Sequence, residues 1–220
     1  MGAGETEGRT ALARGSWKQD PEAVKTDILR VAREEFAAHG LSGARIDHIA
    51  ARTRTSKRMI YYYFGDKNGL YRQVLEEAYR SVRSREASLD LADLPPIDAL
   101  RKLVGHTFDH HRDNPEFIRL VMIENIHHGD HLADSPIIKE LNSAAIENLE
   151  DIYGRGRKAG LFRTGLTALQ LHWQISALSF FSVSNRATFS LIFGDSLYAP
   201  DRRSDLRQEV EEMVLRYVLK

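Results

Sequence analysis

The chain has 220 residues, 42% of them hydrophobic, and its 31 basic and 31 acidic residues give a formal net charge of zero. This length allows one domain or two small ones with a sizeable core. Because cysteine is absent, a disulfide framework and a thiolate metal site are both excluded. A neutral chain can bind nucleic acid only through a local basic patch. The N-terminus has no apolar run that would serve as a secretory signal, so the cytosol is the expected location.

The first half of the chain has the pattern of short helices with clear start signals. Residues 1–20 lack periodicity and are predicted to be a disordered tail. Asp20-Pro21-Glu22 then begins a helix, with proline at the first helical position and acid in the first turn, and Gly40 is expected to end it. Ser56 and Asp66 are predicted to cap two later helices. Helices are predicted, in chain order, over 21–40, about 44–52, 57–64 and about 67–89.

The second half is predicted to be helical as well, after the linker LADLPP. Helical patterns cover about 97–113, 115–128, 135–160, 166–193 and 204–219. Residues 164–185 form the longest stretch without charge, but its histidine, glutamines and hydroxyl groups favour a buried helix over a membrane span. No alternation typical of strands is present, so the sequence predicts an all-α fold.

The second and third predicted helices are joined by the tight turn Thr53-Arg54-Thr55. A helix, a short turn and a helix form the helix-turn-helix arrangement, whose second helix enters the DNA major groove with its N-terminal residues leading. Six basic and two acidic residues lie in 43–67, a net charge of about +4 in a neutral chain. The three consecutive tyrosines 61–63 fan around the helix at about 100° per residue, so at least one of them faces outward.

Nine residues of this segment are candidate DNA contacts. Lys57 and Lys67 are expected to bind phosphates, and Arg58 has the reach for a guanine edge, although a phosphate contact competes. Ser56 could do no more than cap its helix, and simple solvation is an equal alternative for Arg45. The candidates are Arg45, Thr55, Ser56, Lys57, Arg58, Tyr61, Tyr62, Tyr63 and Lys67.

These residues resemble the TetR family of bacterial transcriptional regulators, over about 24–75. The DNA-binding domain of that family ends in an aromatic-rich third helix followed by a lysine, here residues 60–64 and Lys67. The resemblance implies a three-helix DNA-binding domain over 21–66 and an effector-binding and dimerisation domain over 67–220. It also implies a homodimer that binds a pseudo-palindromic operator, usually as a repressor, and releases it when a small effector binds. No cofactor or enzymatic activity is expected.

The turn departs from the family pattern, which is usually Ala-Gly-Val. Glycine is preferred there because the position tends to be left-handed, and a residue with a side chain would cost roughly 1 kcal/mol or more. Two alternatives remain for Arg54: it offsets this cost by reaching a phosphate, or the turn has a different conformation.

Two C-terminal helices are predicted to form the dimer interface. The helix around 169–183 is apolar on most sides, and the last helix has one apolar stripe, so both could meet a second subunit. The alternative is that both complete the core of a monomer. The candidate interface residues are Trp173, Leu178, Phe181, Met213, Val214 and Tyr217.

A pocket for the effector is harder to locate from the sequence. A ligand pocket needs mostly apolar walls and a few polar groups. Such groups could come from His106, His110, Glu124, Asn125 and Trp173. For each of them, a structural role with ordinary hydrogen bonds is an equal alternative.

The segment His127-His128-Gly129-Asp130-His131 raises a second interpretation, that of a helical metal-binding protein or metal-dependent enzyme. Imidazoles and a carboxylate can bind zinc or nickel. However, adjacent histidines at a helix end point apart, and no nucleotide-binding or catalytic motif accompanies them. Metal analysis of the purified protein separates the two interpretations.

Overall fold

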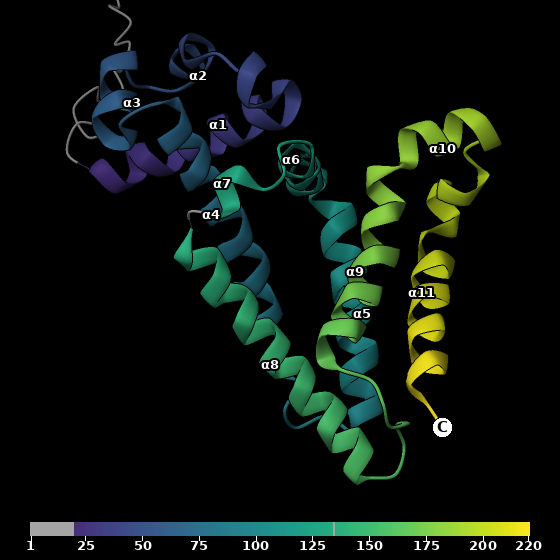
Figure 1. The fold of residues 1–220 in the computed structure, drawn as a ribbon. Coiled ribbons are helices and arrows are strands. Elements are labelled where there is room, and N and C mark those ends of the chain that lie inside the picture. The colour runs from purple at the N-terminus through teal and green to yellow at the C-terminus, as the bar shows by residue number, and fades with distance from the viewer. Residues whose placement is uncertain (1–19, 134) are drawn as a thin grey trace, which may run out of the picture.

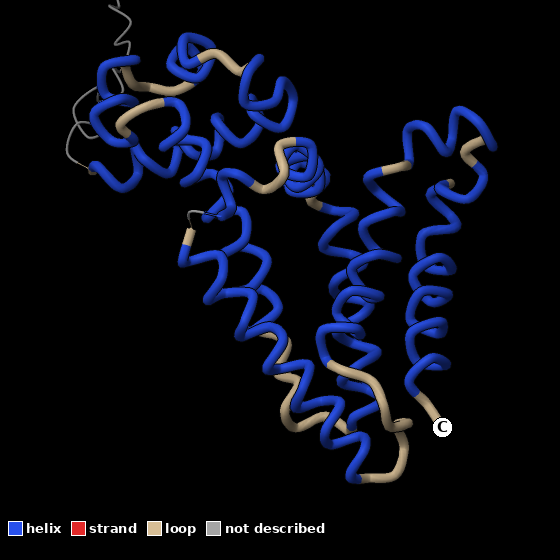
Figure 2. The backbone as a smooth tube through the Cα atoms, in the orientation of Figure 1, coloured by secondary structure: helices blue, strands red, loops and turns tan. Residues whose placement is uncertain are grey.

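The computed structural model describes residues 20–133 and 135–220, and each named element within these ranges is a helix (Figure 1). The α-helices are α1 (Pro21–Gly43), α2 (Ile46–Arg52), α3 (Lys57–Phe64), α4 (Lys67–Ala87), α5 (Pro96–Asp113), α6 (Pro115–Ile126), α7 (Asp130–Ala133), α8 (Pro136–Lys158), α9 (Ala168–Ser184), α10 (Arg186–Phe193) and α11 (Arg203–Val218), with short 3-10 helices η2 (Ser196–Tyr198) and η3 (Pro200–Arg202) before α11. Figure 2 shows only helix and loop in the described ranges, so the all-α prediction is confirmed. The predicted disordered tail lies outside the described residues except for Asp20.

The N-terminal helices begin at the caps that the sequence predicts. The Asp20 side chain accepts hydrogen bonds from two backbone N–H groups of the first turn of α1, both at 3.1 Å. Ser56 Oγ accepts one at 3.3 Å at the start of α3, and Asp66 Oδ1 accepts one at 2.7 Å at the start of α4. Gly40 has φ +68°, a conformation that glycine adopts without strain, and there the helical path of α1 is interrupted before a last turn that runs to Gly43.

The buried side chains form two hydrophobic cores. The first joins α1, α2 and α3 to the first half of α4, and Leu120 of α6 and Ile138 of α8 also pack into it. The second joins α5, α8, α9 and α11. The first core extends along α4 as far as Ala78, so this helix belongs to the N-terminal domain at one end and runs into the C-terminal domain at the other.

The two domains are connected by α4 and α6. In Figure 1, α1 to α3 form the group at the upper left, α4 leaves this group beside α8, and α5, α9 and α11 lie to the right. A second connection runs from α1 to α6, where Arg33 Nε forms an ion pair with Glu116 at 2.9 Å. In the same contact, Arg119 Nε donates a hydrogen bond to the carbonyl oxygen of Ala37 at 2.7 Å.

The predicted single helix over 166–193 is in fact two helices. It breaks at Asn185, which ends α9 and begins α10, and α10 diverges from α9 at the upper right of Figure 1. Thr167 caps α9 in a reciprocal capping box with Gln170, a start signal that the hydrophobic periodicity alone did not locate. No helix in the described part of the chain is long and apolar enough to cross a membrane.

Candidate DNA-binding surface and effector pocket

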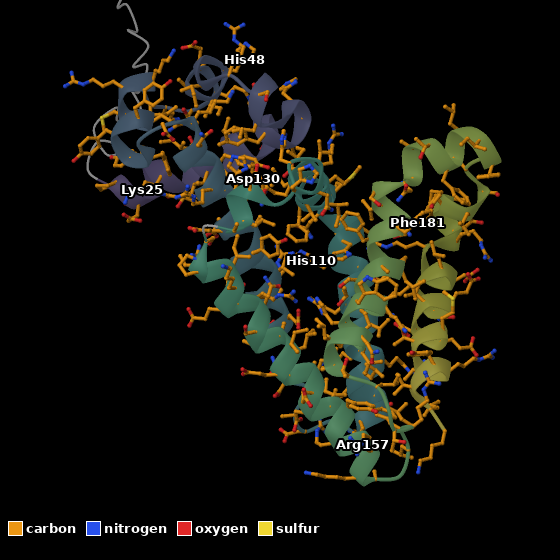
Figure 3. The ribbon with its side chains drawn as sticks, viewed as in Figure 1. Lys25, His48, His110, Asp130, Arg157 and Phe181 are labelled. Atoms are coloured by element: carbon orange, nitrogen blue, oxygen red, sulfur yellow. The ribbon has the colours of Figure 1, made fainter. Side chains whose placement is uncertain are left out.

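Helix α2 is held in place by a carboxylate from α1. Arg45 precedes α2 without a side-chain cap, but its backbone N–H donates to Glu35 Oε1 at 3.1 Å. The same oxygen lies 3.4 Å from Nδ1 of His48, whose ring is on the outer face of the domain (Figure 3). Glu35 is buried, so its carboxylate fixes the start of α2 against α1. This contact has no local signal in the sequence, because the carboxylate comes from ten residues upstream.

Helix α3 divides into a buried ridge and two exposed ridges. Ile60 and Phe64, one turn apart, are buried in the first core. Lys57 and Tyr61 form one exposed ridge, and Arg58 and Tyr62 form the other, with Tyr62 77% exposed. Each exposed ridge thus carries a cation on the first turn and an aromatic ring on the second, an arrangement suited to phosphates and base edges.

The remaining candidate DNA contacts are less uniform in exposure. Tyr63 is half-buried and packs against the first core, with Lys25 Nζ 5.6 Å from the centre of its ring. It therefore faces less toward solvent than the sequence predicts. Thr55 and Lys67 are half-buried, whereas Arg45 and Ser56 are exposed at the start of α2 and α3.

Both lysines that are expected to bind phosphate have a partner in the protein. Lys57 Nζ lies 3.0 Å from Asp47 of α2, and this hydrogen bond and charge raise the pKa of Lys57. Lys67 Nζ donates to the carbonyl oxygen of Ser42 at 3.2 Å. An ammonium group has three donors, so each contact orients the lysine and leaves donors for a phosphate.

The turn between α2 and α3 does not have the left-handed conformation of the usual glycine. Within the described residues, the non-glycine positions with positive φ are Asp90 and His128, and neither lies in this turn. Thr53 is extended, and its hydroxyl donates to the carbonyl oxygen of Ile49 at 3.0 Å. The expected strain at Arg54 is therefore absent, and the alternative of a different turn conformation is the correct one.

A cavity of about 280 Å³ lies inside the C-terminal domain, between α4, α5, α6, α8 and α9. Two predicted ligand residues, His106 and His110, line it, and Figure 3 shows His110 in the interior between α4 and α5. The sequence did not single out the other polar wall residues. The full lining is Tyr79, Val82, Arg83, Glu86, His106, Thr107, His110, His111, Phe117, Val121, Asn142, His172, Ser176 and Phe180.

The polar wall of this cavity centres on Arg83, whose side chain is 13% exposed. Its Nη1 donates to Glu86 within α4, and its Nε and Nη2 donate to Asn142 Oδ1 of α8 at 3.1 and 2.6 Å. Opposite, burial lowers the pKa of both His110 and His111 from 6.5 to about 4, so both rings are neutral near pH 7.

Three of the predicted ligand residues lie outside this cavity. Glu124 is buried, but its carboxylate accepts the backbone N–H of His131 at 3.2 Å and lies 3.1 Å from Nδ1 of the same residue. Asn125 is exposed at the end of α6, and Trp173 is 70% exposed on the outer face of α9. The carboxylate of Glu124 is thus bonded within the protein and does not line the inner cavity.

The side chains of the histidine-rich segment are not grouped around a common point in the described residues. No group of three histidine, aspartate or glutamate side chains is placed to hold a metal ion in residues 20–133 and 135–220. His131 is turned inward to Glu124, and its ring lies 5.1 Å from that of Tyr71. His128 is exposed in a left-handed turn. The metal interpretation therefore has no support in the structure.

The predicted interface residues divide between surface and core. Trp173, Phe181 and Met213 are exposed large apolar side chains. Leu178 and Tyr217 are half-buried against the second core. Val214 is only 1% exposed in the single chain, so it belongs to the protomer's own core.

A second, larger cleft of about 910 Å³ lies between α1 and α6 on one side and the C-terminal end of α9 with α10 on the other. It is more open than the inner cavity, and its walls include Met122, Val183 and Tyr198 along with Arg112 and Arg186. The sequence did not predict it, because it depends on the direction that α10 takes after the break at Asn185.

The fold and the basic, outward-facing α3 define a helix-turn-helix protein with a helical C-terminal domain. Residues 28–74 match the family model of bacterial regulatory proteins of the tetR family, and residues 96–214 match the tetracyclin repressor-like C-terminal domain. The chain therefore belongs to the TetR family, and it is a transcriptional regulator. The regulators of this family bind operator DNA and function as dimers.

Individual relatives agree with this assignment. The HTH-type transcriptional repressor NicS of Pseudomonas putida is 34% identical over 90% of this chain and 93% of its own length. The HTH-type transcriptional repressor SCO4008 of Streptomyces coelicolor is 40% identical over 50% of this chain and 54% of its own. Among solved structures, the putative transcriptional regulator SCO4942 of Streptomyces coelicolor superimposes with a TM-score of 0.64, at 26% identity over 86% of this chain and 97% of its own.

Proposed function

We propose that the protein is a homodimeric repressor that binds a pseudo-palindromic operator and releases it when a small molecule occupies the cavity between α4, α5, α6, α8 and α9. One observation carries this proposal. Helix α4 begins at Lys67, on the DNA-facing side, and its second half supplies Tyr79, Arg83 and Glu86 to the cavity wall. A ligand that moves this wall therefore also moves the start of α4 and the recognition helix packed against it.

For DNA binding, we assign the contacts with DNA to the two exposed ridges of α3 and to Lys67. Arg58 and Tyr62 would reach base edges in the major groove, while Lys57 and Lys67 would bind flanking phosphates. The ion pair of Lys57 with Asp47 joins α2 to α3 and sets the direction in which the lysine points. The boundary of the DNA-binding domain is proposed at residue 66, with α4 as the shared element.

For assembly, we assign the dimer interface to the outer face of α9 together with α11. Leu169, Trp173 and Phe181 are exposed at intervals of four and eight residues, so they form one apolar stripe along α9. Met213 of α11 is also exposed, and α11 packs beside α9. Two such pairs related by a two-fold axis would form a four-helix interface.

Selection of binding sites from random duplex DNA tests the proposed function. The enriched sites are expected to contain two inverted half-sites whose centres lie one helical turn, about 34–36 Å, apart. Enrichment of a single half-site, or of no sequence, would contradict a dimeric operator-binding regulator. Arg58→Ala should relax the preference at one position in each half-site, while Arg80→Ala, on the exposed side of α4, should leave the selected sequence unchanged.

A further inference from the structure

We propose that the inner cavity takes a small organic anion with a single ring, whose charged group is bound by Arg83 and by the imidazoles of His110 and His111. This inference rests on the proposed function only in treating the cavity as the effector site. It adds the chemical class of the effector, and three features of the cavity support it: a guanidinium with donors to spare, imidazole nitrogens without partners, and a small volume with aromatic walls.

The first feature is the charge of Arg83. Three of its five N–H donors are occupied, one by Glu86 and two by Asn142, which leaves one donor on each terminal nitrogen. A guanidinium binds a carboxylate with two parallel hydrogen bonds more strongly than it binds a neutral acceptor. The two remaining donors are therefore available to an entering carboxylate.

The second feature is the set of buried imidazole nitrogens without a partner. His106 Nε2, His110 Nε2 and His111 Nδ1 are all buried and lack a hydrogen-bond partner in the described protein. A buried polar atom left unpaired is destabilising, so such atoms in a cavity wall are available to bond with a ligand. The three nitrogens belong to side chains of one helix, α5, that line the same cavity as Arg83.

The third feature is the sign of the electrostatic potential at these rings. After burial, the charges that act on these rings are mostly cationic: Arg85, His106 and Arg83 lower the pKa of His110, and His110, Arg83 and His172 lower the pKa of His111. The opposing carboxylates are Glu86, which acts on His106 and His172, and Asp109 and Asp113, which act from α5 itself. At His110 and His111 the cations dominate, so an anion is attracted there and a cation is repelled.

The rest of the wall sets the size and shape of the ligand. Tyr79, Phe117 and Phe180 supply ring edges and faces, and the rings of Tyr79 and Phe117 meet edge to face at 5.3 Å. A volume of about 280 Å³ is just below the range of roughly 300–1,000 Å³ that holds drug-sized ligands. One flat ring with a charged substituent fits these limits, whereas a long acyl chain or a nucleotide does not.

Binding of an anion also has a consequence for protons. A negative charge beside His110 or His111 raises the pKa of the imidazole from about 4, so over the pH range between the two pKa values the complex binds a proton that the free protein does not. The affinity should therefore rise as the pH falls through the raised pKa, by at most tenfold per pH unit for each proton taken up. A neutral ligand with the same ring should show little of this dependence between pH 8 and pH 6.

Calorimetric and thermal-shift titrations of the full-length protein, without DNA, test the inference. The probes are benzoate, 3-hydroxybenzoate and 4-hydroxybenzoate, each compared with the corresponding amide at pH 8, 7 and 6. We expect at least one acid to bind at least tenfold more tightly than its amide, and to bind more tightly at pH 6 than at pH 8. If none of the acids binds at millimolar concentration, or if the amides bind as tightly as the acids, the proposal is wrong.

Two variants on the same helix sharpen the experiment. Arg83→Gln should weaken the acid at least tenfold and leave the amide nearly unchanged, whereas Arg80→Gln, one turn earlier and exposed, should leave both unchanged. If Arg83→Gln fails to fold, Arg83→Lys keeps the charge without the paired donors and should weaken the acid by a smaller factor. Unchanged binding of the acid to Arg83→Gln overturns the assignment. These titrations contain no DNA, so they are independent of the operator selection. If an acid binds the cavity but the selection yields no operator, the proposed function is rejected and the assignment of the ligand class stands.

Discussion

Lys57 of α3 and Lys67 of α4 reach the proposed DNA-binding surface from different helices, and each is oriented by a contact within the protein. Lys57 is aimed by Asp47 of the neighbouring α2, and Lys67 by the carbonyl oxygen of Ser42. Preorganised side chains lose less conformational entropy when they bind a ligand. These contacts therefore favour phosphate contacts that fix the register of α3 and do not select a sequence.

Lys67→Ala should weaken binding to all DNA sequences by a similar factor. Removal of one phosphate contact should lower the slope of log affinity against log salt by roughly 1. Titrations of operator and non-operator duplexes at several salt concentrations measure this, with Lys139→Ala on the exposed surface of α8 as the control. A loss confined to one operator base pair would show that Lys67 reads a base.

The buried histidines predict a loss of stability in acid. The pKa of His110 and of His111 is about 4 in the folded protein, against 6.5 in the unfolded chain. Below pH 6.5 the unfolded chain binds protons that the folded protein does not, so stability falls as the pH drops from about 6.5 toward 4. Each histidine contributes up to about 1.4 kcal/mol per pH unit. The free energy of unfolding, measured with urea, should differ less between pH 7 and pH 5 for His111→Asn than for the wild type. The exposed control His39→Asn should behave like the wild type.

The burial of a residue was predictable from the sequence where its spacing along a helix is sufficient to place it. Ile60 and Phe64 lie one turn apart on an amphipathic helix, and both are buried as the pattern predicts. The sequence did not decide whether Trp173 lines a pocket or lies on the surface. Helical periodicity shows which face of a helix carries a side chain, but it does not show what packs against that face. The same limit applies to Arg83, whose partner Asn142 is 59 residues away.

At the level of secondary-structure elements, the turn between α2 and α3 has a conformation different from the one that the family pattern predicts. A family pattern with glycine predicts a left-handed position, but Thr53 is extended and its hydroxyl bonds to the end of α2. The break between α9 and α10 was also missed, because Asn185 lies in a continuous apolar periodicity without glycine or proline. Helix existence was therefore predictable from periodicity, whereas these two junctions depend on side-chain hydrogen bonds and tertiary packing.

Two substitutions at Arg54 distinguish the two turn conformations. Because no residue of the turn has positive φ, glycine should only add entropy to the unfolded chain. Arg54→Gly should then be less stable than Arg54→Ala by about 0.4–1 kcal/mol, measured by urea unfolding. A left-handed turn would reverse the order, with the glycine variant the more stable of the two.

At the level of the whole molecule, the exposed stripe of α9 predicts how two protomers assemble. Trp173 and Phe181 are exposed in the single chain, so charged substitutions there should leave the protomer folded and disrupt the interface. Trp173→Glu with Phe181→Glu should sediment as a monomer of 25.0 kDa and lose operator binding. Ile137→Glu, on the exposed surface of α8, is the control and should remain a dimer. Val214→Glu would not be informative, because it places a charge in the protomer's own core.

The effector and the operator should be coupled through two routes that meet at the cavity. Tyr79 of α4 and Phe117 of α6 touch in its wall, and both helices reach the DNA-binding domain, α4 by its first turn and α6 by the bond from Arg119 to Ala37. An effector shifts the equilibrium only if it binds more tightly to the state in which the two recognition helices are misplaced. The coupling free energy should be about 1–3 kcal/mol and reciprocal.

For any ligand that stabilises the protein in a thermal-shift screen, operator affinity should fall about 5- to 150-fold at saturation, and saturating operator should weaken the ligand by the same factor. Arg119→Ala removes one of the contacts between α6 and α1 without touching the inner cavity, so it should reduce this factor while the ligand affinity of the DNA-free protein stays the same. Lys139→Ala serves again as the surface control. If Arg119→Ala leaves the factor unchanged, the bond from Arg119 to Ala37 does not transmit the signal. If a ligand shown to bind the cavity leaves operator affinity unchanged in the wild type, neither helix transmits it and the cavity is not the regulatory site.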